Sequence, residues 1–382
     1  MLIRHGTRYP SQSEIQKFFK LADIRDDIIK NHKNGAGNLS STILKQLSDW
    51  RLNPDMTIES AYKLTSQGKQ DMYQLARRLR NIFPELLQVD PKKVKHGDFV
   101  FRATNTERTQ SSLAAFTEGI FGTSEEIVPP EKPPTNDTLL LAYKNCPAWE
   151  KHYWEDHYDR ESNQFAVGPE VEKLLRQVTR RLGYNQTLDY DVARTLYNIC
   201  RFETAWQPQN LSSWCYLFTN DELKIFEYQE DLDHYYYCGP GRQWNADLGC
   251  QPLKDMHAHF KEIIDGNSKN HAKGVFYFAH TVTIETVMAA LGFDGGSSKP
   301  LLAANYSSSQ DRKYRTSLLG PFATNIIAVL YNCAGSMTPY TVSFYVAENL
   351  ERIENCYNGL CDWSFIDQKL SQHVNNCSLN FC

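Results

Sequence analysis

Several hallmarks of other protein classes are missing from this sequence. No apolar run reaches the roughly 18 residues that a membrane-spanning helix needs, so no such helix is expected. Lysine and arginine (41 residues) do not outnumber aspartate and glutamate (45 residues), and the net charge of −4 argues against nucleic acid as a partner. The chain starts with no recognisable signal peptide, and it ends with neither an ER-retention signal nor a hydrophobic anchor signal. An ordinary globular protein is the class that remains.

The cysteines are not arranged for a metal ion. No Cys-x-x-Cys pair occurs, so the sequence predicts no zinc site, and no other metal or cofactor is expected. The ten cysteines are an even number and predict up to five disulfides, and six Asn-x-Ser/Thr sequons accompany them. We therefore expect a glycosylated protein of the secretory pathway, either secreted or in the ER lumen. The candidate glycosylation sites are Asn38, Asn136, Asn185, Asn210, Asn305 and Asn376.

The most informative stretch is Arg4-His5-Gly6-Thr7-Arg8, directly after the apolar residues 1–3. The apolar residues indicate the end of a strand, and Gly6 permits a sharp turn after it. A guanidinium group can bind two phosphate oxygens at once, and imidazole is a nucleophile that can be phosphorylated. The pattern therefore predicts a phosphoryl-transfer site with His5 as the nucleophile. A strand usually has about five or six residues, but only three residues precede Arg4 here. We therefore expect that a natural amino-terminal segment, including a signal peptide, is missing.

Two later stretches repeat the strand–turn–helix pattern. A predicted strand over residues 98–101 leads to Arg102 and Arg108, and a predicted strand over residues 274–279 leads to His280. In open α/β sheets, ligands bind outside the carboxyl ends of the strands. We therefore expect one of these two arginines and His280 to converge on His5, and the strand pattern leaves open which arginine it is.

The remaining pattern predicts an α/β protein with a mixed central sheet flanked by helices. Residues 124–236 have mostly helical patterns and are predicted to form a cap inserted into a discontinuous core of residues 1–123 and 237–382. The tail from Cys356 has little periodicity and is expected to be stapled to this core. Helices are expected at residues 13–31, 57–87, 110–118 and 284–291, and strands at 98–101, 274–280, 325–332 and 340–346.

Several of these stretches together resemble the histidine acid phosphatases, and most closely the multiple inositol polyphosphate phosphatases. The matching blocks are residues 4–11, 64–68, 101–109, 121–122, 167–170 and 321–325. The resemblance implies an α/β core with a helical cap and inositol hexakisphosphate or 2,3-bisphosphoglycerate as the substrate. It also implies that Arg108, and not Arg102, contacts the phosphate, and that His280 binds a phosphate oxygen.

These residues predict a mechanism. His5 attacks phosphorus in line and forms a phosphohistidine, which water then hydrolyses. Arg4, Arg8, Arg108 and His280 stabilise the equatorial oxygens, so the arginines take the place that Mg²⁺ has in other phosphoryl transfers.

The source of the leaving-group proton is where this chain departs from the family. Members carry an acid either directly after the third-block histidine or two residues after it, whereas here Thr281 and Val282 occupy these positions. Glu285 lies three residues beyond Val282 and is a candidate proton donor. The alternative is a first-turn glutamate that the helix dipole favours. Lys17 and Lys20 are candidates for contacts with outer phosphates, and exposed surface lysines are the alternative.

Three functions remain open at this point. The first is an extracytoplasmic phosphatase of the inositol-polyphosphate type that acts through His5. The second is a weakly active or inactive phosphate-binding relative, which the missing acid favours. The third is a phosphoglycerate mutase-like enzyme, against which the cysteines, the sequons and the helical insertion argue. The sequence does not indicate the oligomeric state.

Overall fold

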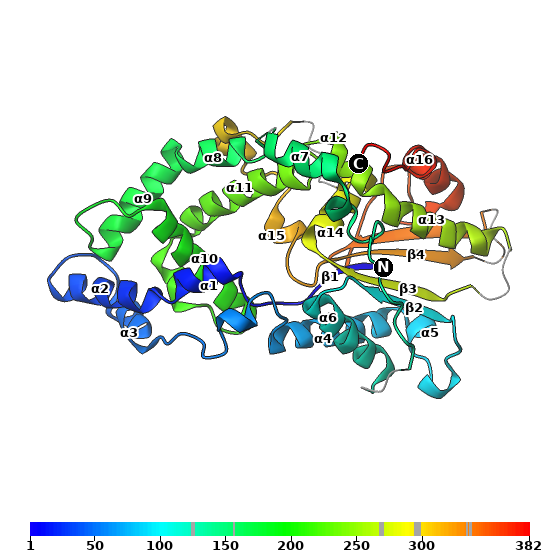
Figure 1. Cartoon of the computed structure of the whole chain (residues 1–382), viewed down its shortest axis with the longest axis horizontal. Coiled ribbons are helices and arrows are strands. Elements are labelled where there is room, and N and C mark those ends of the chain that lie inside the picture. Colours follow the sequence, from blue (N-terminus) through cyan, green and yellow to red (C-terminus); the bar gives the residue numbers. More distant parts are fainter. Residues whose placement is uncertain (124–126, 156, 267–270, 294–298, 334, 336–337) are drawn as a thin grey trace.

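A sheet flanked by helices forms one side of the molecule, and a purely helical lobe forms the other (Figure 1). The computed structural model describes residues 1–123, 127–155, 157–266, 271–293, 299–333, 335 and 338–382. Residues 124–126, at the start of the predicted insertion, lie outside this described part.

The sheet is mixed, which confirms the predicted fold class. Its strands are β1 (Leu2–Arg4), β2 (Phe99–Ala103), β3 (Gly274–Ala279), β4 (Asn325–Asn332), β5 (Tyr340–Val346), β6 (Asn349–Leu350) and β7 (Cys361–Asp362). They follow the order β2-β3-β1-β4-β5-β6, with β7 paired to β5. β1 and β2 both run parallel to β3, and β4 is antiparallel to β1. The carboxyl ends of β1, β2 and β3 therefore meet at one edge of the sheet.

Helices cover both faces of the sheet with apolar side chains. The longer ones are α4 (Ser66–Ile82) and α6 (Glu107–Phe121) on one face, and α13 (Cys250–Ile264), α14 (Thr281–Leu291) and α16 (Trp363–Asn375) on the other. Leu75, Phe116 and Phe278 are buried in the first layer, and Ile284 and Phe344 are buried in the second. Burial of these apolar surfaces is the main favourable contribution to folding.

The helical lobe has its own core. It consists of α1 (Gln12–Phe18), α2 (Leu21–Lys33), α3 (Ser41–Asp49), α8 (Arg160–Ala166), α9 (Pro169–Leu182), α10 (Tyr190–Trp206) and α11 (Asn220–Tyr237). One buried cluster joins side chains of residues 15–58 to those of residues 174–226, with Trp214 and Phe226 fully buried in it. The helical core thus draws on the amino-terminal segment as well, while the predicted boundaries of the insertion stay a prediction.

Several expected elements are confirmed, and others differ for local reasons. β4 and β5 have the predicted bounds, whereas the helix expected over residues 13–31 is divided into α1 and α2. The helix expected over residues 57–87 begins only at Ser66, where the Thr65 hydroxyl accepts from the Gly68 N–H (3.0 Å). It is interrupted at Phe83 because Pro84 has no N–H to continue the helical hydrogen bonds. The tail forms the unexpected helix α16.

Disulfides fasten the tail to the core. Cys250 is bonded to Cys377, Cys146 to Cys382, Cys356 to Cys361, and Cys200 to Cys215. These are four bonds against the predicted maximum of five, because Cys238 is buried and unpaired and Cys333 is exposed and unpaired. Such bonds persist in oxidising compartments, in agreement with a protein of the secretory pathway. Over the described residues, every helix is too short or too polar to cross a lipid bilayer.

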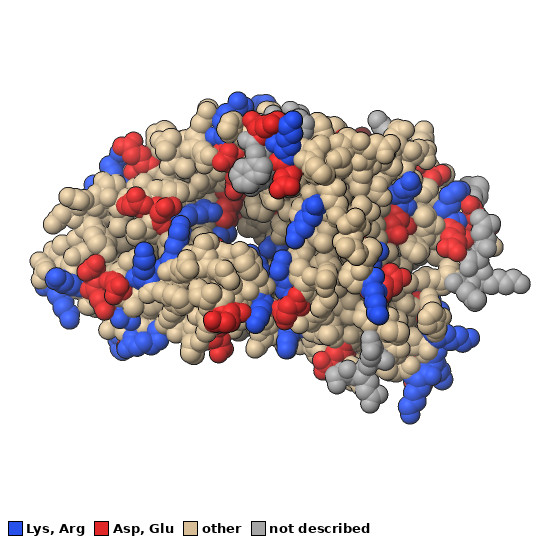
Figure 2. Space-filling model, viewed as in Figure 1, with Lys and Arg blue, Asp and Glu red and all other residues tan. Residues whose placement is uncertain are grey.

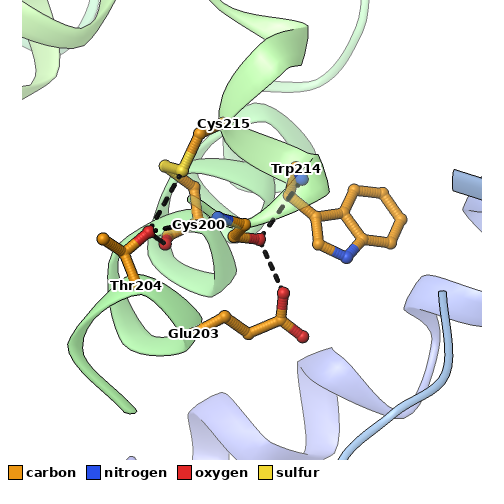
Figure 3. The surroundings of a disulfide bond; sticks show 6 residues. Cys200, Glu203, Thr204, Trp214 and Cys215 are labelled. Carbon is orange, nitrogen blue, oxygen red and sulfur yellow. Dashed lines mark hydrogen bonds between the residues drawn. A yellow bond between two sulfur atoms is a disulfide. The ribbon is translucent and has the colours of Figure 1, made fainter. Parts of the chain in front are cut away.

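The Cys200–Cys215 disulfide joins α10 to the turn that follows it (Figure 3). The Thr204 hydroxyl lies 3.5 Å from the Cys215 sulfur, and Glu203 accepts a hydrogen bond from the Ser212 hydroxyl (2.6 Å). Trp206, at the last residue of α10, donates its indole N–H to the carbonyl oxygen of Arg8 (3.2 Å). The helical lobe therefore reaches the amino-terminal motif through this end of α10.

Candidate active site

The turn that follows β1 is fixed on both sides by the sheet. The Arg4 N–H donates to the Thr324 carbonyl (2.8 Å), and the His5 N–H donates to the Ala279 carbonyl (3.1 Å). The Ala323 N–H donates to the carbonyl oxygen of His5 (3.1 Å). These bonds hold the backbone of Arg4 and His5 at the carboxyl edge of the sheet.

Two glycines allow this turn to pack directly against the start of α4. Gly6 is not in the left-handed conformation; instead, a Cβ on it would lie only 2.3 Å from the Gly68 carbonyl oxygen. A Cβ on Gly68 would lie 2.1 Å from the Thr7 carbonyl oxygen. Asp71 accepts from the Thr7 N–H (3.0 Å) and hydroxyl (2.6 Å), and Ser112 accepts from the Gly6 N–H (3.0 Å). Close approach, and not a sharp turn, is therefore the reason for Gly6.

The His5 ring is held in the form that suits a nucleophile. It is buried, and its Nδ1 lies 2.9 Å from the carbonyl oxygen of Gly6. Because a carbonyl oxygen only accepts, Nδ1 carries the proton and Nε2 keeps its lone pair. Burial, followed by the positive charge of Arg4, lowers the pKa of His5 well below the usual 6.5. The imidazole is therefore neutral, and its nucleophilic nitrogen is Nε2.

Arg4 and Arg8 lie beside His5 over a shared aromatic ring. The Cζ atoms of Arg4 and Arg8 lie 4.6 and 6.0 Å from the centre of the Phe322 ring, and the His5 ring lies 5.9 Å from it. Burial and then repulsion by Arg8 lower the pKa of Arg4 to about 9, so Arg4 stays charged at neutral pH. Burial also lowers the pKa of Arg8. Buried like charges at such short range favour a bound anion.

His280 connects the third arginine to the same place. Its ring centre lies 5.6 Å from that of His5. The Arg108 guanidinium lies 3.2 Å from His280 Nδ1, and the Thr104 hydroxyl lies 3.0 Å from His280 Nε2. Burial and then the charge of Arg108 lower the pKa of His280 to about 3, so its ring is neutral. The structure therefore brings the five predicted residues together, with His5 and His280 in edge-to-face contact.

Arg102, the alternative to Arg108, makes a different contact. Its guanidinium forms an ion pair with the buried carboxylate of Asp137 (2.5 Å). Arg102 is thus already neutralised, whereas Arg108 contacts an imidazole that carries no charge. The arrangement leaves Arg108 as the better partner for an anion.

The space-filling view shows where an anion would approach. Between the helical lobe and the sheet, the surface is hollowed, and Lys and Arg side chains gather around and inside this hollow (Figure 2). Acidic side chains are scattered over the same face, and some of them lie beside the hollow (Figure 2). Positive charge in a concave site attracts anionic ligands although the whole chain is mildly acidic.

Glu285, the candidate proton donor, lies in a separate buried cluster. Its carboxylate is 3.0 Å from His234 Nδ1, 3.1 Å from the Cys238 sulfur and 2.9 Å from the Tyr314 hydroxyl. Burial alone would raise the pKa of Glu285, but the charge and hydrogen bond of His234 hold it below the usual 4.5. An ionised carboxylate has no proton to give, so these contacts argue against the donor role, which stays a prediction.

The other predicted site residues lie outside this centre. Lys17 and Lys20 are exposed, and the Lys17 amine lies 3.8 Å from the Asp191 carboxylate. All sequon asparagines except Asn305 are exposed, whereas Asn305 is half-buried and its amide donates to the Pro300 carbonyl (3.1 Å). Phosphate contacts by the lysines and glycosylation of the asparagines stay predictions.

Sequence reasoning missed the residues that hold the site in shape. Thr104 orients His280, Asp71 and Ser112 fix the turn, and Phe322 lies against His5. Thr104 and Phe322 lie within the blocks that carried the family resemblance. Membership of these blocks was the only feature of the sequence that could have marked them as site residues. Nothing in the local sequence marks Asp71 or Ser112, because their partners are distant in the chain.

Comparisons with known proteins agree with this geometry. The model of the histidine phosphatase superfamily (branch 2) matches residues 1–347. Multiple inositol polyphosphate phosphatase 1 of Drosophila melanogaster is 31% identical over 99% of this chain and 80% of its own length. The human protein of the same name is 29% identical over 88% of this chain and 70% of its own length.

Solved structures show the same fold. The phytase of D. castellii superposes with a TM-score of 0.74 at 18% identity. The match covers 98% of this chain and 78% of the phytase chain. The multiple inositol polyphosphate phosphatase of Bifidobacterium longum, solved with inositol hexasulfate, superposes with a TM-score of 0.70 at 14% identity, over 97% of this chain and 91% of its own.

Proposed function

This chain belongs to branch 2 of the histidine phosphatase superfamily, and on that premise we propose that it removes phosphate from inositol polyphosphates through a phosphohistidine on His5. It is a phosphoric monoester hydrolase. The observation that carries the proposal is the neutral His5 ring, whose Nδ1 is engaged by Gly6 and whose Nε2 keeps its lone pair among cationic side chains.

The first step is attack of His5 Nε2 on phosphorus, in line with the leaving oxygen. The N–P bond forms as the P–O bond breaks, and the leaving oxygen departs as an alcohol with a proton taken from solvent water. The ring stays oriented through its Nδ1–H bond to Gly6. Arg4, Arg8 and Arg108 neutralise the charge on the equatorial oxygens. Water then attacks the phosphohistidine, which releases phosphate and restores the neutral imidazole.

Arg108 and His280 require one exchange of hydrogen bonds. A phosphate oxygen accepts more strongly than the neutral Nδ1 of His280, so Arg108 donates to the substrate when it binds. His280 then needs a proton on Nδ1 in order to donate as well. The Thr104 hydroxyl both donates and accepts, so it can bond either form of His280 Nε2. Thr104 therefore supports the tautomer that places a second donor on the phosphate.

The substrate is assigned from chemistry and from the relatives. Inositol hexakisphosphate carries several phosphates, which suits the hollow lined with Lys and Arg, and the two relatives are named for inositol polyphosphates (Figure 2). We extend the proposal to 2,3-bisphosphoglycerate, which is also a small polyanion. The site of action is outside the cytosol, in the ER lumen or after secretion, where the disulfides are stable.

Release of phosphate from two substrates tests the proposal. We expect the purified protein to hydrolyse inositol hexakisphosphate and p-nitrophenyl phosphate, and His5→Ala to lose both activities by at least about 10³-fold, as for removal of other catalytic nucleophiles. His96→Ala, which changes an exposed histidine, is the matched control and should keep both. Folded protein that cleaves neither substrate, or His5→Ala that retains turnover, would overturn the proposal. Rapid-quench detection of phosphohistidine in the active protein adds a direct test of the intermediate.

A further inference from the structure

A cluster of three potential metal ligands lies outside the catalytic centre. His234 is in the last turn of α11, Cys238 follows that helix directly, and Glu285 is on α14. The His234 Nδ1, the Cys238 sulfur and a Glu285 carboxylate oxygen lie within 4.8 Å of one another. Cys238 and Glu285 are buried, and the side chain of His234 is 35% exposed. The cluster is therefore buried on one side and reachable through the histidine.

The spacing of these atoms matches the size of a bound cation. Glu285 Oε2 lies 3.2 Å from His234 Nδ1 and 3.1 Å from the Cys238 sulfur, and Nδ1 and the sulfur are 3.9 Å apart. A circle through three points with these separations has a radius of about 2.0 Å, so an ion slightly above its plane would lie about 2.0–2.3 Å from all three. These are the Zn–N, Zn–O and Zn–S distances.

The chemistry of the donors also favours zinc. A mixture of thiolate, imidazole and carboxylate suits Zn²⁺, whereas Ca²⁺ and Mg²⁺ prefer oxygen ligands alone. Tyr314 donates to Glu285 (2.9 Å), which orients the carboxylate towards the cluster. Cys238 is buried and unpaired in a chain that bonds eight other cysteines in disulfides, so its thiol is available as a ligand.

We propose that His234, Cys238 and Glu285 bind one zinc ion, with water in the fourth position. The cysteine spacing predicts no such site, because it depends on two helices that meet only in the fold and on a His-x-x-x-Cys pair across a helix end. Binding removes two protons, one from the Cys238 thiol and one from Nδ1 of the charged His234 ring, and both leave to solvent.

The zinc site adjoins the phosphate site through Gly320. A Cβ on Gly320 would lie 2.8 Å from Glu285 Oε1, and the Gly320 carbonyl accepts a hydrogen bond from the Arg4 guanidinium. Zinc therefore fixes the Glu285 carboxylate, which packs against Gly320, and Gly320 in turn holds Arg4. Its role is to position this wall of the site, and the hydrolysis itself runs through His5.

Titration of metal-free protein with Co²⁺, without a polyhistidine tag, tests the proposal. A cobalt–thiolate bond gives a charge-transfer band in the near ultraviolet, which we expect to saturate at one equivalent and to disappear when Zn²⁺ is added. Cys238→Ser should remove the band and weaken Zn²⁺ binding on the order of 100-fold or more, since a direct ligand matters at least as much as its supporting partners. Cys333→Ser, which changes the exposed unpaired cysteine, is the matched control and should keep both.

Two further variants keep the outcome decisive. His234→Gln changes a partly exposed side chain and should weaken Zn²⁺ binding even if Cys238→Ser folds poorly. His5→Ala should bind Zn²⁺ like the unchanged protein, so a failure of the zinc proposal is separate from a failure of the phosphatase proposal. Absence of one-to-one Zn²⁺ binding in the unchanged protein, or a cobalt–thiolate band that persists in Cys238→Ser, would refute the zinc site.

Discussion

Gly68→Ala is the substitution that most directly tests how the catalytic turn is built. Position 68 lies in the first turns of α4, where alanine would normally stabilise a helix by about 1 kcal/mol over glycine. Here the new Cβ would lie 2.1 Å from the Thr7 carbonyl oxygen, which is backbone and cannot rotate away. Helix propensity alone therefore predicts that Gly68→Ala stabilises the protein, whereas the structure predicts that it destabilises the protein.

The size of the effect follows from the displacement. Ordinary van der Waals contact for a Cβ begins at 3.4 Å, and the new Cβ at position 68 would lie only 2.1 Å from the Thr7 oxygen. The turn and the helix must therefore move apart by about 1.3 Å at Thr7, which is two residues after His5. Overpacking of this kind destabilises by about 1–3 kcal/mol. A shift of about 1 Å in a catalytic group lowers the rate on the order of 100-fold, and we expect that loss in kcat/KM.

Denaturant unfolding and hydrolysis of p-nitrophenyl phosphate measure the two effects on the same protein. Lys69→Ala changes the exposed neighbour on α4 and should leave both quantities nearly unchanged. If Gly68→Ala were more stable than the unchanged protein and equally active, the close packing of α4 would not be what positions His5, and the reasoning would be wrong.

The other predictions concern the partners of the site and the helical lobe. Thr104→Val leaves a His280 ring nitrogen without its partner, so we expect a loss of about 1–3 kcal/mol in unfolding free energy and about tenfold in kcat/KM. Because the pKa of His280 is lowered from 6.5 to about 3, the unfolded chain binds its proton first, and stability is lost as the pH falls below 6.5. When the pH falls from 7 to 5, the unfolding free energy of His280→Asn, measured with denaturant, should decrease by about 2 kcal/mol less than that of the unchanged protein. An equal decrease in both proteins would contradict a neutral His280. Glu285→Gln should change kcat for inositol hexakisphosphate and p-nitrophenyl phosphate by the same factor, whereas a selective loss on the inositol substrate would identify Glu285 as the proton donor. Replacing Cys200 and Cys215 by alanine opens a bond across 15 residues and should lower the unfolding free energy by about 3 kcal/mol, measured against the native protein under non-reducing conditions.

The catalytic residues were predictable because each lies in a strand–turn–helix unit, at the end of the strand or within a few residues after it. A short apolar run followed by Arg4-His5-Gly6 or by His280 is a local pattern, and strand–turn–helix units direct such ends to one edge of the sheet. The choice of Arg108 over Arg102 came from the family resemblance. The state of His5 was not predictable. It depends on burial and on the hydrogen bond to the Gly6 carbonyl, and neither has a local signal.

The sequence by itself determined the four longer strands, the phosphate chemistry and the oxidising compartment, because apolar runs, guanidinium groups and cysteine counts act through local or additive properties. Only the tertiary structure decided that Gly6 serves close packing and that Cys238 stays unpaired. It also decided that the buried Glu285 faces the partly exposed His234. Each of these depends on contacts between residues far apart in the chain, and a one-dimensional pattern carries no record of which distant side chains the fold brings within bonding distance.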